Sequence, residues 1–84
     1  MKSFDNLALS ESGFLFDAVS GDTYTLNNTG KLVLRELMGG TDEEAIVGRV
    51  MENFDVGVET ASRDTERFIH HLKEMKLIPR ENGD

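Results

Sequence analysis

A short strand-like segment that passes directly into a capped helix constrains the fold more than any other feature of this sequence. Thr23-Tyr-Thr-Leu26 alternates polar and apolar residues, which is typical of a strand with one buried face. From Asn27 the period changes to that of a helix, and Asn27, Asn28 or Thr29 can each supply the N-cap oxygen. Gly39-Gly40 ends this helix. The sequence therefore predicts a strand-to-helix junction with almost no connecting loop.

Two short apolar stretches precede this junction. Leu7-Ala-Leu9 and Phe14-Leu-Phe16 are separated by Ser10-Glu-Ser-Gly13, a polar connector of the length that hairpins use. A second break, Ala18-Val-Ser-Gly-Asp22, separates them from the strand at Thr23–Leu26. We therefore expect three antiparallel strands in a meander.

Two further amphipathic helices are predicted after Gly39-Gly40. Thr41-Asp-Glu-Glu44 fits a capping box, in which Thr41 binds the amide near Glu44 and the Glu44 carboxylate reaches back. Asp55-Val-Gly57 stops that helix, and the last helix starts near Glu59. Its apolar positions repeat at three and four residues: Ala61, Phe68, Ile69, Leu72 and Met75. The predicted fold class is α+β and winged-helix-like, with a three-stranded antiparallel sheet followed by three helices.

The length of the chain bounds its organisation. A chain of 84 residues makes one domain with one modest core, so we expect a single domain over residues 1–84. Its ordered core is expected at about residues 4–78, with a short flexible C-terminal tail after Pro79. The absence of Cys excludes disulfides, iron–sulfur ligation and thiol catalysis. No window is apolar enough for a membrane span or a signal peptide, so a cytoplasmic location and no membrane partner are expected.

The charge distribution argues against nucleic acid as a partner. The formal net charge is −7, whereas affinity for DNA or RNA depends on Lys and Arg that neutralise phosphates. The segment 59–76, where a recognition helix would lie, carries four basic and four acidic side chains. A peptide with basic residues is a better partner for this chain.

No pattern typical of an enzyme or a metal site competes with a binding function. His70 and His71 are neighbours on a helix, so their rings point about 100° apart and cannot readily chelate one ion. Asp42-Glu43-Glu44 suits a helix dipole better than a calcium loop. Ser10, Ser12 and Ser20 have no base nearby in pattern. We therefore expect no catalysis, no metal and no cofactor.

The order and spacing of several residues carry a family resemblance. Gly21 and Asp22 precede Tyr24, Leu26-Asn-Asn-Thr-Gly30 forms the junction, and a hydrophobic spacing follows. The remaining matching residues are Val33, Leu34, Leu37, Gly40, Thr41, Phe54, Val56, Asp64, Phe68, Leu72, Leu77 and Ile78. With these residues the stretch Gly21–Ile78 resembles the PqqD family, whose small domains hold the leader segment of a ribosomally made precursor peptide for a modifying enzyme.

The resemblance implies a function and a site. The leader is expected to add antiparallel to the third strand and to place its side chains against the third helix, as in β-augmentation. The strand would contribute Asp22, Thr23, Tyr24, Thr25 and Leu26, and the helix would contribute Asp64, Arg67, Phe68, His71 and Met75. Spacing alone favours a core role for Phe68 and Met75, and Asp64 with Arg67 fits a solvated i,i+3 pair.

The expected partners follow from the same resemblance. They are a precursor leader peptide and a modifying enzyme, such as a radical S-adenosylmethionine protein or a leader protease. The chain itself would be a monomer or a homodimer. The alternative is a winged-helix regulator that binds DNA or another protein.

Overall fold

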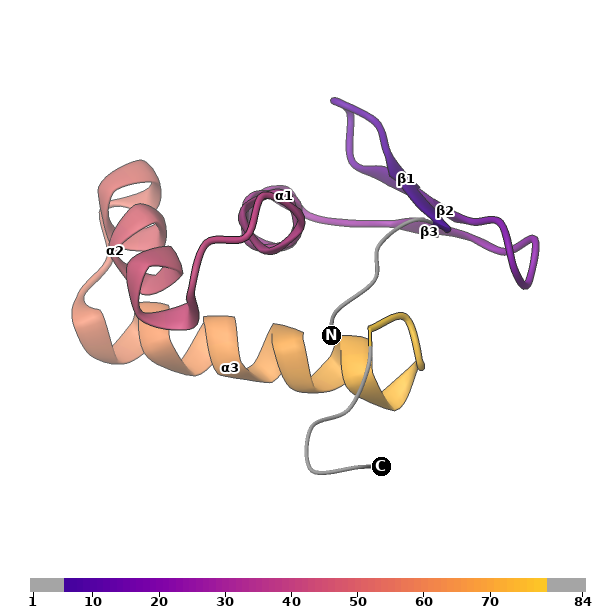
Figure 1. Cartoon of the computed structure of the whole chain (residues 1–84). Helices are drawn as coiled ribbons and strands as arrows, with labels where there is room; N and C mark the ends of the chain where they lie inside the picture. Colours follow the sequence, from indigo (N-terminus) through magenta and orange to yellow (C-terminus); the bar gives the residue numbers. More distant parts are fainter. Residues whose placement is uncertain (1–5, 79–84) are drawn as a thin grey trace.

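The computed structural model describes residues 6–78 and has the predicted order of three strands followed by three helices (Figure 1). The strands are β1 (Leu7–Leu9), β2 (Phe14–Asp17) and β3 (Thr23–Thr25), and the helices are α1 (Asn28–Met38), α2 (Glu43–Phe54) and α3 (Val58–Glu74). The α+β prediction is confirmed. The expected flexible tail and residues 4 and 5 of the expected core lie outside the described residues.

The sheet is an antiparallel meander in the order β1-β2-β3. Leu15 of β2 lies opposite Tyr24 of β3, and Phe14 lies opposite Thr25. Gly13, at the end of the β1–β2 turn, has φ 98°, and a Cβ there would lie 2.8 Å from the Leu26 carbonyl oxygen. Glycine is therefore required at this position both by the backbone conformation and by the close approach of the third strand.

The two faces of β2 have different environments. Leu15 is fully buried against the helices, whereas Phe14 and Phe16 are 53% and 44% exposed. Successive side chains of a strand point to opposite faces, so the two aromatic rings lie on the side of the sheet away from the core.

The junction between β3 and α1 is as short as the sequence predicts. Asn27 is the N-cap of α1, and its Oδ1 accepts a hydrogen bond of 2.7 Å from the Gly30 amide. Lys31 donates from Nζ to the Glu11 carbonyl oxygen at 2.8 Å, which ties the start of α1 to the β1–β2 turn. These bonds fix the direction in which α1 leaves the sheet.

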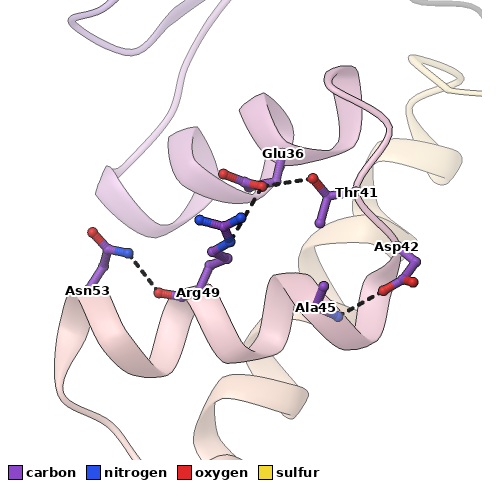
Figure 2. Close-up of polar contacts among 6 residues, drawn as sticks. All are labelled: Glu36, Thr41, Asp42, Ala45, Arg49 and Asn53. Carbon is purple, nitrogen blue, oxygen red and sulfur yellow. Dashed lines mark hydrogen bonds and ion pairs between the residues drawn. The ribbon is translucent and has the colours of Figure 1, made fainter.

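The predicted capping box at Thr41 is wrong by one residue. Asp42 caps α2, with its Oδ1 accepting a 2.9 Å bond from the Ala45 amide, while the Thr41 hydroxyl donates to Glu36 Oε1 at 2.8 Å (Figure 2). The reason is tertiary, because the Glu36 carboxylate on α1 engages the Thr41 hydroxyl that would otherwise cap the helix. Arg49 Nε of α2 lies 3.9 Å from the same Glu36 oxygen (Figure 2).

The core lies between the sheet and the three helices. The buried apolar residues are Leu15, Val33, Leu34, Leu37, Ile46, Val50, Ala61, Ile69, Leu72, Leu77 and Ile78. Two residues of the stripe predicted for α3, Phe68 and Met75, are only partly buried at its margin. Thr65 is fully buried on α3 and was not predicted as a core residue. Within residues 6–78, no helix is long and apolar enough to cross a membrane.

Candidate functional site

One side of β3 is an open strand edge. Within the described part of the chain, β3 pairs with β2 alone. The Leu26 amide donates to the Gly13 oxygen at 2.8 Å, and the Asp22 oxygen accepts from the Asp17 amide at 2.9 Å. Alternate residues of a strand direct their backbone groups to opposite sides, so Thr23 and Thr25 direct N–H and C=O away from β2. These groups can hydrogen-bond to an added strand.

A hollow lies between the start of α1 and the middle of α3. Its volume is about 480 Å³, within the range of ligand sites in proteins. It is lined by Asn27, Thr29 and Gly30 from the start of α1, and by Asp64, Arg67, Phe68, His70 and His71 from α3. We call it the α1–α3 hollow. Figure 1 shows α1 nearly end-on above α3, so the two helices cross.

The wall of the α1–α3 hollow depends on a glycine. A Cβ at Gly30 would lie 2.9 Å from Phe68 Cε1 and 3.2 Å from Phe68 Cζ. The aromatic ring of α3 therefore lies directly against the backbone of α1. A side chain at position 30 would therefore require the Phe68 ring to move.

Charged groups surround this aromatic contact. Arg63 Nε lies 3.6 Å from Asp64 Oδ1, and both side chains are substantially exposed. Asp64 and Arg67, the predicted i,i+3 pair, form no ion pair with each other in the described structure. A partly exposed pair of the Arg63–Asp64 kind contributes little to folding. Asp64 and Arg67 can therefore form ion pairs with a ligand at a small cost in folding free energy.

The structure brings together most of the predicted helix row. Asp64, Arg67, Phe68 and His71 line the α1–α3 hollow, but Met75 does not. Met75 is the C-cap of α3, where the helix ends, and it packs at the margin of the core.

The predicted strand residues do not line the hollow but lead into it. Tyr24 and Leu26 are half-buried against the core, and Asp22 lies just before β3. Asn27, which lines the hollow, follows Thr25 by two positions, so their Cα atoms are within about 7 Å. The open edge of β3 and the α1–α3 hollow are thus adjacent.

Four lining residues were missing from the predicted site: Asn27, Thr29, Gly30 and His70. The sequence signal was the N-cap pattern, because a helix that starts right after an edge strand presents its first turn beside that edge. His70 is exposed and lines the hollow, and its Nε2 lies 3.8 Å from Glu74 Oε2. Among residues 6–78, no group of three His, Cys, Asp or Glu side chains is placed to hold a metal ion.

Two solved structures have the same fold as this chain. "Lasso peptide synthetase B1 complexed with the leader peptide" has a TM-score of 0.76 and 25% sequence identity, covering 88% of each chain. "TbiB1 in Complex with the TbiA(beta) Leader Peptide" has a TM-score of 0.81 and 24% identity over 100% of each chain. No curated protein matches the chain at a significant level.

A protein-family comparison gives the assignment. The family described as "Coenzyme PQQ synthesis protein D (PqqD)" matches residues 12–78, which is more than half of the chain and runs from the β1–β2 turn to the end of the described residues. The matched range contains β2, β3, all three helices and every residue of the α1–α3 hollow. The chain therefore belongs to the PqqD family.

Proposed function

We propose that this chain is a single-domain, non-catalytic adaptor that binds the leader segment of a ribosomally made precursor peptide and presents the peptide to a modifying enzyme. The carrying observation is the open edge of β3, which leads within two residues into the α1–α3 hollow. Support also comes from the similar lasso peptide synthetase B1, whose structure holds a leader peptide.

The open edge would supply the affinity. A leader that lies antiparallel to β3 can pair with the outward N–H and C=O groups of Thr23 and Thr25. Pairing of this kind uses backbone atoms alone, so it accepts many sequences. It needs no change in the β2–β3 ladder, because that ladder uses the backbone groups on the other side of β3.

The α1–α3 hollow would supply the selectivity. Phe68 offers an apolar surface, Asp64 can pair with a Lys or Arg of the leader, and Arg67 can pair with an acid. Since the chain carries a formal net charge of −7, a leader with basic residues would also associate faster than an acidic one.

The adaptor would act through effective concentration. A leader bound to this domain keeps the rest of the precursor close to any enzyme that also binds the domain. The effective concentration of the precursor at the enzyme is then raised, even where their direct affinity is weak. The enzyme would be a radical S-adenosylmethionine protein or a leader protease. We also place the adaptor in the cytoplasm, where ribosomes make its ligand.

Replacing Thr25 with Pro tests strand addition. Proline removes the outward N–H of position 25 and leaves the inward bonds of Asp22 and Leu26 to β2 in place. We expect at least a tenfold loss of affinity for a synthetic leader peptide encoded beside this protein, measured by isothermal titration calorimetry.

The matched control is Thr25→Ala, which keeps the N–H and changes only an exposed side chain. It should bind the leader within about twofold of the parent, since the contact uses the backbone. A Thr25→Pro protein that keeps its amide NMR dispersion and binds as well as the control would rule out strand addition at β3.

A further inference from the structure

A second groove lies on the other side of α3, between α2 and α3. Its volume is about 550 Å³. The residues that line it are Glu43, Glu44, Val47, Gly48 and Met51 of α2, and Val58, Ser62 and Glu66 of α3. We call it the α2–α3 groove. It shares no lining residue with the α1–α3 hollow.

The position of the α2–α3 groove leaves it free when a leader is bound. Glu66 of the groove follows Asp64 of the hollow by two positions, so the two side chains leave α3 about 200° apart. Figure 1 shows α2 and the first turns of α3 at the end of the molecule opposite the sheet. A second macromolecule can therefore bind here without meeting the edge of β3.

The groove has an apolar floor and an acidic rim. Val47, Met51 and Val58 supply the apolar surface, and Val58 is 56% exposed although it is aliphatic. Glu43, Glu44 and Glu66 supply the rim, and no Lys or Arg is among the lining residues.

Gly48 leaves the backbone of α2 uncovered by a side chain at this groove. It lies in the interior of α2, where glycine lowers helix stability relative to alanine. A Cβ at Gly48 would meet no heavy atom within 4 Å, so the packing of the described chain does not require a glycine here. A missing side chain on an open groove allows the close approach of another backbone.

We propose that the α2–α3 groove receives an amphipathic helix of a partner protein, with an apolar stripe flanked by Lys or Arg. Beyond the first turns, the backbone groups of α2 and α3 are bonded within their own helices, so an added strand finds no continuous row of partners there, whereas a helix docks by side-chain packing. The acidic rim selects basic flanks and disfavours a second copy of this chain, whose groove carries the same acids. It also disfavours anionic membranes and nucleic acids.

The probe is a lactam-stapled helix with a leucine stripe flanked by lysines, and the comparison peptide has glutamates in place of the lysines. We expect the lysine peptide to bind the full chain with amide shifts centred on Val47, Gly48, Met51 and Ser62. The glutamate peptide should bind at least tenfold more weakly, and salt should weaken the lysine peptide. A leader peptide added first should leave this affinity unchanged.

Two substitutions at Gly48 separate binding from folding. Gly48→Leu fills the groove and should reduce lysine-peptide affinity at least tenfold, whereas Ala45→Leu, at an exposed α2 position outside the groove, should not. Both variants should bind the leader normally, which separates this proposal from the function proposed above. Gly48→Ala should raise Tm by about 4 °C or more, because the helix gains a better former.

Several results would overturn the proposal. They are no binding of the lysine peptide, equal binding of both peptides, unchanged affinity in Gly48→Leu, or shifts centred on the α1–α3 hollow. If the chain binds anionic lipid vesicles in a flotation assay with higher affinity than it binds the lysine peptide, the groove would be a membrane-binding surface instead.

Discussion

At the scale of single residues, the contact between Gly30 and Phe68 links the fold to the site. The glycine is in the first turn of a helix, where its amide is bonded to the Asn27 cap, and its missing side chain sets the position of the Phe68 ring. A residue without a side chain thus shapes the wall of the α1–α3 hollow. Any substitution there must shift either the backbone of α1 or the Phe68 ring of α3.

The variant Gly30→Ala should change binding more than stability. Alanine is a better helix former than glycine, but its Cβ would lie 2.9 Å from Phe68 Cε1, so the ring must move and part of that gain is lost. We expect Tm to change by only a few degrees and leader affinity to fall at least fivefold. Thermal melts and calorimetric titration measure the two effects.

The control for this variant is Gly48→Ala, which makes the same chemical change on α2 without a nearby heavy atom. It should stabilise the protein and leave leader affinity as it is. If Gly30→Ala behaves in the same way as Gly48→Ala, then Phe68 does not form the wall of the leader site.

The residue row on the last helix was predictable because helical spacing decides which side chains share a face. Asp64, Arg67, Phe68 and His71 follow from that rule and do line one hollow. The other wall could not be found in this way, since it depends on how α1 crosses α3, and that crossing is set by tertiary packing around Gly30.

At the scale of elements, the start of α2 shows which local rules are decisive. Two adjacent residues, Thr41 and Asp42, are both good N-caps, and the preference for Asp over Thr is small. The structure assigns the cap to Asp42 because Glu36 of α1 accepts the Thr41 hydrogen bond (Figure 2). The strands and the other helix ends needed no such partner, and their predicted bounds agree with the structure to within one or two residues.

Replacing Asp42 tests this assignment. Asp42→Ala leaves the Ala45 amide without its acceptor and should reduce the free energy of unfolding by about 1 kcal/mol. Asp42→Asn keeps an acceptor and should lie close to the parent, which separates capping from charge. Urea unfolding followed by circular dichroism measures both free energies of unfolding. If Asp42→Ala leaves the free energy of unfolding unchanged and Glu44→Ala lowers it, the capping box at Thr41 is correct and the Asp42 cap is not.

At the scale of the whole molecule, the small size of the domain makes ligand binding visible as stability. A ligand at a hundred times its Kd that binds only the folded state adds about 2.7 kcal/mol to the free energy of unfolding. For a domain of 60–100 residues each kcal/mol shifts Tm by roughly 4–8 °C. We therefore expect a cognate leader at that concentration to raise Tm by about 10 °C or more in a thermal-shift assay, and a scrambled leader to leave it unchanged.

The antiparallel sheet also has a consequence for how precursor peptides are built. A leader antiparallel to β3 ends beside the turn that precedes Thr23, at the end of the sheet away from α1, so the part to be modified departs from there (Figure 1). The longest dimension of the molecule is 36 Å, which an extended chain crosses in about ten residues. If the partner on the α2–α3 groove is the modifying enzyme, it would favour modification sites at least about ten residues downstream of the bound leader segment. The precursor gene would then set the site of modification through the number of residues between the leader and the first modified residue.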